Sequence, residues 1–471
     1  MANWTSTPSD SKISVNATPN AITHILNRLS LGPRPGDRHR IESMGLDAYI
    51  QEQLEPDSIA EPQHLVQRLQ SLDTQAKPVL ELFQQHHQLE KEGKSAQQRL
   101  RQQATEEAIQ SRLLRAIDSS RQLQEVMVDF WFNHFNVFLY KGNVSLWLGS
   151  YEQDGIRAHA LGNFRSLLEA TAKHPAMLFY LDNWRNTDPR SSGAVGPYKG
   201  LNENYARELM ELHTLGVDGG YSQADVEALA RILTGWSVIN PGQNSLNEYG
   251  FFFAHNRHDH GRKGFLSTSI TGSGVTEGEL ALDLLAYHPS TAHHISFKLV
   301  QYFVSDQPPT ALVEDLATEF QATEGDISKV LRRLFSHPEF WAEEHQQNKF
   351  RTPYQYVMAI ARSMGLTDPS VRTLSTLKGI LYNLQMPLYQ CRPPDGYAQT
   401  QDKWLSPDAM LRRINVVNRL TKAYRDELTD VEKLMATIHH QFSDQTQTTV
   451  QSATATLKST LVLGSPEIMY R

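Results

Sequence analysis

The sequence predicts an all-α fold, a large multi-helix bundle that carries one small β-hairpin patch near residues 249–268. Most of the chain places apolar residues three and four apart, with few glycines or prolines between them. This spacing is typical of helices that bury one face. One segment departs from it, because aromatic runs flank a polar turn in YGFFFAHNRHDHGRKGFLSTSI. We therefore expect strands there and helices elsewhere.

Bulk properties limit the class of protein. The chain has 471 residues, a formal net charge of −7 and a single cysteine, Cys391. Its length exceeds that of one ordinary compact core. The acidic balance, without a basic block, argues against a nucleic-acid partner. One cysteine permits no intrachain disulfide, which fits a reducing compartment.

The sequence contains no visible segment that would cross or enter a membrane. It has no run of about 18 apolar residues, the length that a spanning helix needs. It starts with MANWTSTPSDSKIS, which lacks the basic and apolar regions of a secretory signal. We expect no membrane span and a cytoplasmic location, although this pattern leaves export open.

The chain is expected to divide into an arm, a domain and a tail. Residues 1–19 are rich in Ser, Thr, Asn and Pro and predict a disordered arm. Residues 20–440 predict one large helical domain, from which a polar helical hairpin projects at about 75–118. Residues 441–471 predict a polar tail and a short terminal helix.

The densest group of ionisable residues lies at 200–220, KGLNENYARELMELHTLGVDGG. At about 100° per residue, one polar helix face is formed by Glu203, Asn204, Arg207, Glu208 and Glu211. His213 lies on the opposite, apolar face, so a regular helix keeps it away from Glu208. The polar face has two interpretations. It is an exposed ladder of i, i+4 ion pairs, or its N-terminal end binds an anion or oxyanion.

Two histidines lie on apolar stripes and are expected to be buried. His134 lies among aromatic residues at helical spacing in LQEVMVDFWFNHFNVF, and His213 ends the central helix. Each ring has a structural interpretation, as a core histidine bonded to backbone. Alternatively, the two helices meet and present both rings to one metal pocket, with Glu208 or Asp259 arriving from elsewhere.

The turn RHDHGRKG is a second candidate, because His258 and Asp259 would act together as base and orienting group. The alternative is an exposed polar turn. Cys391 shows no neighbouring base and is not assigned as a nucleophile. The sequence has no Walker loop and no GxGxxG, HExxH or GxSxG motif. These absences argue against a P-loop NTPase, a Rossmann dehydrogenase, a zincin and an α/β-hydrolase.

A series of motifs between His24 and Asn415 resembles a known bacterial family. In chain order they are HILNRLSLGPRPGD, FWFNHFNV, HPAMLFYLDNW, NENYARELMELHTLGVDGGYSQADV, ARILTGW, RHDHGRKGF, HPSTAHHISFKLV and CRPPDGY. The family is domain-of-unknown-function family 1800. The resemblance implies an α-helical protein with no assigned activity that partners a neighbouring sulfatase-like protein. It also implies export in many members, a point on which this chain departs because no signal is visible.

Two hypotheses about function follow. The first is a metal-dependent or acid/base enzyme, a hydrolase or oxidoreductase, with a polar His/Glu cleft. Its candidate catalytic residues are His134, Asn204, Arg207, Glu208, His258 and Asp259. A divalent metal ion, where one is used, is expected to bind His134, Glu208 and His213. The second hypothesis is a non-catalytic binding or assembly module that docks through the hairpin and partners a sulfatase-like protein.

Overall fold

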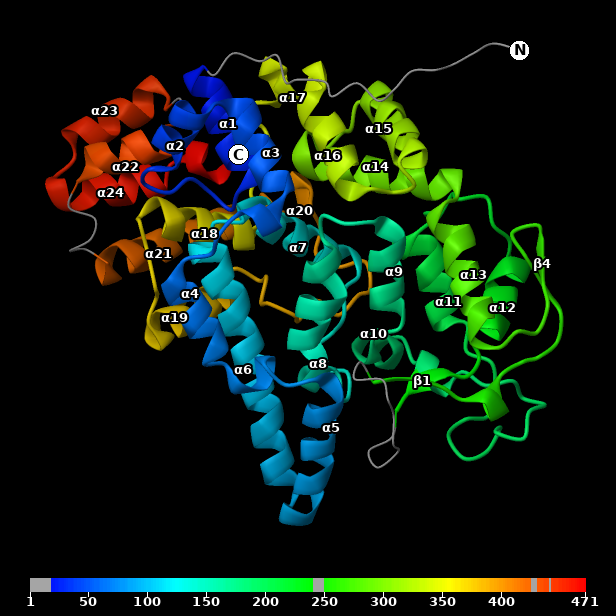
Figure 1. The fold of residues 1–471 in the computed structure, drawn as a ribbon. Helices are drawn as coiled ribbons and strands as arrows, with labels where there is room; N and C mark the ends of the chain where they lie inside the picture. The colour runs from blue at the N-terminus through cyan, green and yellow to red at the C-terminus, as the bar shows by residue number, and fades with distance from the viewer. Residues whose placement is uncertain (1–17, 240–249, 425–429, 440–441) are drawn as a thin grey trace, which may run out of the picture.

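The computed structural model describes residues 18–239, 250–424, 430–439 and 442–471. Helices dominate them, and the predicted all-α fold with a small β patch is confirmed (Figure 1). The N-terminal part contains α1 (Pro19–Leu29), α2 (Asp37–Met44), α3 (Leu46–Leu54), α4 (Gln63–Gln70), α5 (Val79–Gln88), α6 (Lys94–Asp118) and α7 (Gln122–His134). The middle contains α8 (Val144–Ser150), α9 (Phe164–Ala172), α10 (Pro175–Tyr180), α11 (Asn204–Glu208) and α12 (Gln223–Ile232).

The C-terminal half adds a second series of helices. Its first members are α13 (Val275–Ala286), α14 (Pro289–Phe303), α15 (Thr310–Ala322), α16 (Ile327–Ser336), α17 (Pro338–Trp341) and α18 (Pro353–Ser363). Its last members are α19 (Val371–Asn383), α20 (Gln401–Trp404), α21 (Pro407–Ala423), α22 (Val431–Ile438), α23 (Asp444–Ser452) and α24 (Ala455–Leu463). In Figure 1 the first and last helices of the chain lie together at the top of the molecule.

The hairpin of α5 and α6 protrudes from the body at the bottom of Figure 1. α6 runs for 25 residues because its sequence contains neither glycine nor proline. Its buried side chains, among them Leu100, Ala104 and Leu113, face inward, and the helix packs against α8 and α19. The hairpin tip carries polar residues, which is why it remains stable in contact with water.

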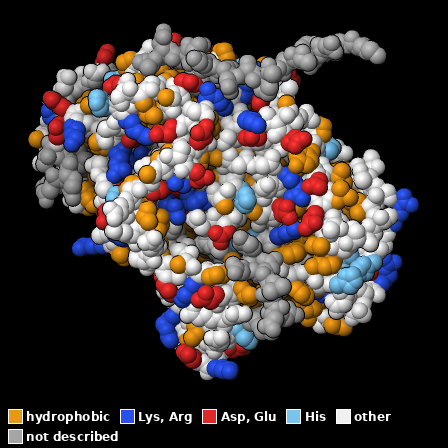
Figure 2. All heavy atoms as spheres, viewed as in Figure 1, with side chains coloured by type: hydrophobic (Ala, Val, Ile, Leu, Met, Phe, Trp, Pro, Cys, Tyr) orange, Lys and Arg blue, Asp and Glu red, His pale blue; other side chains and the backbone are white. Residues whose placement is uncertain are grey.

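Helix α7, which ends at His134, is enclosed along most of its length. Every residue of it except Gln124 and Asn133 is buried, including its charged residues Glu125 and Asp129. Buried carboxylates require partners, because desolvation disfavours an isolated charge. Acidic and basic side chains are otherwise intermixed on the molecular surface drawn in Figure 2.

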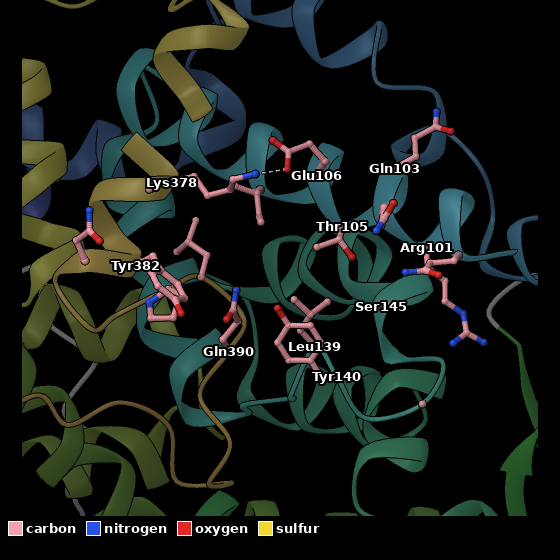
Figure 3. A pocket seen from close by; sticks show the side chains of 18 residues that line it. Arg101, Gln103, Thr105, Glu106, Leu139, Tyr140, Ser145, Lys378, Tyr382 and Gln390 are labelled. Atoms are coloured by element: carbon pink, nitrogen blue, oxygen red, sulfur yellow. Dashed lines mark hydrogen bonds and ion pairs between the residues drawn. The ribbon is translucent and has the colours of Figure 1, made fainter. Parts of the chain in front are cut away.

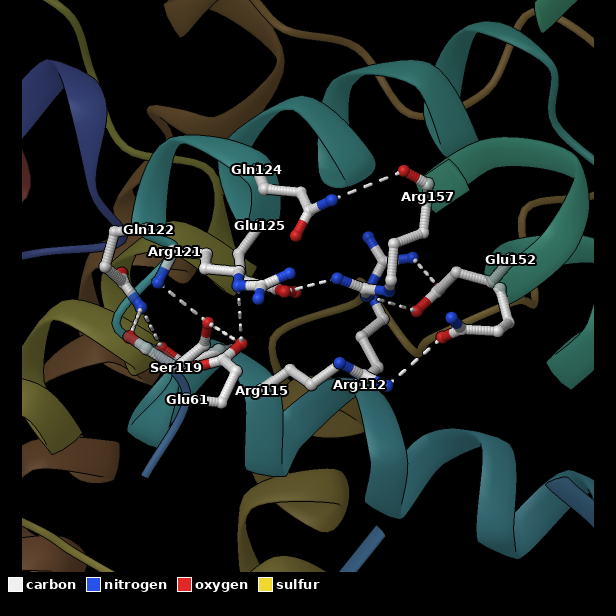
Figure 4. A network of polar contacts seen from close by, with 12 residues as sticks. Glu61, Arg112, Arg115, Ser119, Arg121, Gln122, Gln124, Glu125, Glu152 and Arg157 are labelled. Atoms are coloured by element: carbon white, nitrogen blue, oxygen red, sulfur yellow. Dashed lines mark hydrogen bonds and ion pairs between the residues drawn. The ribbon is translucent and has the colours of Figure 1, made fainter. Parts of the chain in front are cut away.

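A buried ion network supplies those partners. Arg112 binds Asp129 at 2.7 Å and Glu152 at 2.8 Å. Arg157 binds Glu152 at 3.3 Å and also pairs with Glu125 (Figure 4). All five side chains are at most 6% exposed. The network therefore fixes the position of α7 relative to α6 and to the π-helical turn at Tyr151–Ile156.

The β patch consists of two small antiparallel sheets rather than the single predicted hairpin. β1 (Trp236–Val238) pairs with β2 (Phe251–Phe253), and β3 (Lys263–Phe265) pairs with β4 (Thr268–Ile270). The patch thus begins before residue 249, which lies outside the described residues. The aromatic run pairs back to the strand that follows α12, a long-range partner that local alternation does not reveal.

The two ends of the chain contain more helix than the sequence suggested. Residues 1–17 of the predicted arm lie outside the described residues, whereas Thr18 caps α1 through the Ala21 amide at 3.2 Å. Residue 441 is likewise outside them, and the tail contains α23 before the terminal helix α24. Among the described residues, none of the helices combines the length and the apolar character that a membrane span requires.

Candidate acid/base site

The central helix does not stay regular. α11 continues directly into a π-helical turn, η7 (Leu209–His213), and the chain then turns at Gly216, where φ is +83°. The hydroxyl of Thr214 donates to the Leu209 carbonyl at 2.6 Å. Turns of this kind are rare and often occur at functional sites. The wider turn leaves backbone carbonyls at its end free to accept hydrogen bonds from side chains.

Two imidazoles use those carbonyls. His134, the last residue of α7, places Nε2 3.1 Å from the His213 carbonyl oxygen. His294, on α14, places Nε2 3.3 Å from the Leu212 carbonyl oxygen. A carbonyl only accepts, so each Nε2 must carry the hydrogen. In the neutral rings, Nδ1 of both His134 and His294 therefore keeps its lone pair.

Lys298 completes this cluster. It lies one turn after His294 on α14, and its Nζ is 3.5 Å from Nδ1 of His134. The ring of His134 lies 6.1 Å from that of His213 and 6.2 Å from that of His294, centre to centre. His213 is only 1% exposed, and neither of its ring nitrogens has a hydrogen-bond partner among the described residues. The four residues are called the His–Lys cluster below.

Burial governs the protonation of the cluster. Desolvation, followed by the nearby Lys298 ammonium, holds the pKa of His134 well below its usual value. The same two causes lower the pKa of His213 to about 3 and that of His294 to about 4. Burial also lowers the pKa of Lys298, although the Asp395 carboxylate partly opposes this shift. The three rings are thus neutral at pH 7.

The carboxylate of Asp395 links Lys298 to a second carboxylate, Glu208, because its charge acts on both groups. Glu208 is partly exposed and Asp395 is exposed, and neither side chain makes a hydrogen bond or ion pair with any described residue. Desolvation, then repulsion by Glu211, raises the pKa of Glu208, and Asp395 adds to the effect. A carboxyl whose pKa is raised and an ammonium whose pKa is lowered therefore lie in one region of the molecule.

The loop that carries Asp395 is held by the FNHFN turn. Asn136 donates to the carbonyls of Cys391 and Pro393 at 3.0 and 2.8 Å. Asn133 exchanges two hydrogen bonds with the backbone of Tyr397, at 2.7 and 2.8 Å. The asparagines on either side of His134 thus bind the CRPPDGY loop. Burial raises the pKa of the Cys391 thiol to about 12, so this thiol is protonated at neutral pH.

Other predicted site residues have local partners. Arg207 pairs with Glu203 at 3.2 Å and with Glu211 at 3.5 Å, which is the ion-pair ladder. Asn204 donates its side-chain amide to the Leu181 carbonyl at 3.2 Å. Of the polar helix face, this leaves Glu208 as the residue without such a contact among the described residues.

The structure places His258 and Asp259 in a different cluster. Nδ1 of His258 lies 2.8 Å from the Thr234 carbonyl oxygen, and Nε2 lies 3.4 Å from Glu277. Asp259 accepts from Arg231 at 2.7 Å. Both residues are buried, so the turn is not the exposed polar turn that was considered. The ring of His258 contacts the rings of Phe253 and His260, whereas the ring of His134 contacts that of His213.

Sequence reasoning missed His294, Lys298 and Asp395. The first two lie four apart in HHISFKL, the spacing that places them on one side of a helix. That spacing is the signal in the sequence that could have identified the pair. Asp395 lies in a Pro-rich loop, and its place beside the cluster depends on tertiary packing alone.

The ligand atoms of the three residues predicted to bind a metal ion are spread too widely to form a compact group. Among the described residues, Glu339, Glu344 and His345 form a group whose potential ligand atoms lie within 4.8 Å of one another. His134, Glu208 and His213 do not form such a group. His345 lies 3.0 Å from Glu339, so two members of this group already form an ordinary ion pair or hydrogen bond with each other.

The fold and this cluster define a class: a large helical protein in which an FNHFN turn, a π-helical turn and a Pro-rich loop surround buried histidines and a lysine. The chain belongs to the family described as protein of unknown function (DUF1800), whose model matches residues 24–470. The resemblance noted from the motifs is thereby confirmed. No curated protein and no solved structure matches the chain.

Proposed function

We propose that this protein is an acid/base enzyme of the hydrolase class, with Lys298 as the base and Glu208 as the acid. The observation that carries the proposal is that two pKa values are shifted in opposite directions. The pKa of Glu208 is raised and that of Lys298 is lowered, so both move toward neutral pH. Groups shifted in this way cluster at catalytic sites, because a pKa near the working pH is best for proton transfer.

The contacts and pKa shifts of these groups support one role for each of them. Lys298, whose lowered pKa enlarges its neutral fraction, takes a proton from the water that attacks the substrate. His134 holds Nδ1 toward Nζ and so receives a hydrogen bond from the ammonium that forms. The His213 carbonyl fixes the tautomer of His134 by accepting from Nε2. Glu208, protonated in part because its pKa is raised, donates a proton to the leaving group.

A metal-dependent version is the second form of the proposal. Two features support it. Neither ring nitrogen of His213 has a partner among the residues that the structure describes, and Nε2 of His134 is anchored on a carbonyl, as is usual for metal ligands. A divalent ion bound by His134, Glu208 and His213 requires these side chains to move closer. It also requires Lys298 to leave Nδ1 of His134. Elemental analysis of wild type and His134→Ala tests this version, and equal substoichiometric metal in both removes it.

A panel of chromogenic p-nitrophenyl esters, phosphates and glycosides tests the proposed activity. We expect wild type to hydrolyse at least one class, and Lys298→Met and Glu208→Gln each to lower kcat by about 10²- to 10⁴-fold. Glu203→Gln is the matched control, because Glu203 belongs to the ion-pair ladder. The proposal fails if no class is hydrolysed, or if the three variants behave alike.

The alternative is a binding module that partners a sulfatase-like protein, and the protruding hairpin of α5 and α6 supports it (Figure 1). Glu90 and Glu92 lie at the hairpin tip in the short turn Leu89–Glu92. Under this alternative, the double variant Glu90→Lys, Glu92→Lys weakens association with such a partner in sedimentation experiments. Under the enzyme proposal, the same variant hydrolyses its substrate at the wild-type rate.

A further inference from the structure

A groove of about 1040 Å³ lies outside the His–Lys cluster. Its walls come from α6, α19 and the segments 139–145 and 387–390 (Figure 3). This volume lies at the upper end of the range usual for ligand sites, about 300–1000 Å³. The groove therefore has room for several units of an elongated ligand.

Two tyrosines are the exposed large hydrophobic side chains that line the groove among the described residues. Tyr140 is 66% exposed and Tyr382 is 65% exposed, and both line the groove. In Figure 3, Tyr382 extends from α19, and Tyr140 extends from the segment after Leu139. An exposed tyrosine offers an apolar ring face together with a hydroxyl group that hydrogen bonds. Exposed aromatic residues of this kind are characteristic of binding surfaces.

The apolar residues beneath the tyrosines are covered. Ile109 and Leu139 are each 4% exposed, and Leu388 is 7% exposed. These three core residues therefore contribute little to the open surface of the groove. Its remaining surface is rich in neutral amides, which both donate and accept hydrogen bonds. These amides are Gln98, Gln102, Gln103, Asn383 and Gln390.

Three charged side chains line the groove: Lys378 and Glu106 pair with each other, whereas Arg101 hydrogen bonds to neutral partners. Lys378 binds Glu106 at 2.5 Å across the groove (Figure 3). Arg101 donates to Nε2 of His86 at 2.9 Å and to Asn143 at 2.8 Å. A polyanion such as a nucleic acid or an acidic glycan would need a row of free cations, which Arg101 alone does not provide. The groove thus suits an uncharged ligand.

We infer that the groove binds a neutral saccharide chain. A pyranose ring has an apolar C–H face that stacks on tyrosine, and hydroxyl groups at its edge that pair with amides. Tyr140 and Tyr382 would hold two sugar units, and the glutamines of α6 would bind the hydroxyl groups between them. The inference does not depend on the acid/base proposal, because it concerns binding in a separate groove.

Calorimetric titration of the full chain tests the inference. The probes are cellohexaose, maltohexaose and chitohexaose, with hexagalacturonate and a proline-rich decapeptide as competing ligand classes. We expect at least one neutral hexasaccharide to bind, and Tyr140→Ala and Tyr382→Ala each to weaken that binding about tenfold or more. Tyr382→Phe should retain most of the affinity, because the ring face remains.

Tyr287→Ala is the matched control, because Tyr287 is 47% exposed and does not line this groove. Its affinity should equal that of wild type. The inference is overturned if no neutral hexasaccharide binds at millimolar concentration, or if hexagalacturonate or the peptide binds more tightly. Unchanged saccharide affinity in both alanine variants also overturns it. If Lys298→Met binds the saccharide with wild-type affinity, saccharide binding in the groove is independent of the proposed acid/base site.

Discussion

At the scale of single residues, His213 is the least satisfied polar group of the candidate site. Its side chain is 1% exposed, and both ring nitrogens lack partners among the described residues. An unpaired buried polar atom costs roughly 1–3 kcal/mol. Leucine at this position would avoid that cost. The metal-dependent version of the proposal uses this ring as a ligand.

The buried, neutral state of His213 predicts a pH dependence of stability. The unfolded chain protonates this ring near its ordinary pKa of about 6.5, whereas in the folded protein its pKa is about 3. Between these values the unfolded state binds more protons, so the free energy of unfolding falls as pH falls. One such group contributes a slope of about 1.4 kcal/mol per pH unit.

His213→Leu removes this contribution, and its free energy of unfolding should fall less steeply from pH 6.5 toward pH 4. Urea unfolding at half-unit pH intervals measures both curves. His293→Leu is the control, because His293 is exposed on the same region of the fold and is solvated before and after unfolding. Parallel curves for wild type and His213→Leu would contradict the assignment of a buried, neutral ring.

At the scale of elements, the CRPPDGY loop is expected to depend on Gly396. This residue has φ +77°, and a Cβ placed on it would lie 2.3 Å from the Asn133 carbonyl oxygen. Gly396→Ala should lower the free energy of unfolding by at least about 2 kcal/mol, from backbone strain and this clash together. Gly379→Ala is the control. Gly379 lies inside α19 with open space around its Cβ position, so alanine should stabilise the helix by about 0.5–1 kcal/mol.

The buried network around α7 gives a second prediction for an element. Arg112 binds two carboxylates and is 6% exposed, whereas Arg207 binds two carboxylates and is 38% exposed. Arg112→Met leaves buried charges unpaired and should cost about 3–5 kcal/mol. Arg207→Met should cost no more than about 1 kcal/mol. Denaturant unfolding of both variants compares them, and equal losses would show that burial does not govern the network.

The elements also show where prediction from sequence ends. Apolar spacing was enough to predict helices and to place His134 and His213 on buried faces. A regular helix with a constant rotation per residue describes the side-chain directions only as far as Glu208. After it, the π-helical turn η7 changes the direction of the chain. No local pattern distinguishes that turn from a regular helix. Lys298 reaches His134 through the packing of α14, a contact between residues far apart in the sequence.

At the scale of the whole molecule, burial increases in steps from Asp395 to His213. Asp395 is exposed, Glu208 and Lys298 are partly exposed, and His213 is buried. The groove proposed to bind saccharide lies along the same two chain segments, since Tyr140 follows His134 by six residues and Gln390 precedes Asp395 by five. The FNHFN turn and the CRPPDGY loop thus connect the two proposed sites. Both motifs are visible in the sequence, but the hydrogen bonds between them are seen only in the structure.

The pKa of Lys298 in solution tests the acid/base claim most directly. Lysine side-chain NMR across a pH titration measures it, and the signal missing from Lys298→Met identifies the residue. We predict a midpoint below the ordinary lysine value of about 10.4, because burial disfavours the ammonium. Asp395→Asn should lower the midpoint further, because the carboxylate opposes that shift. A midpoint at or above the ordinary value would contradict the assignment of Lys298 as the base.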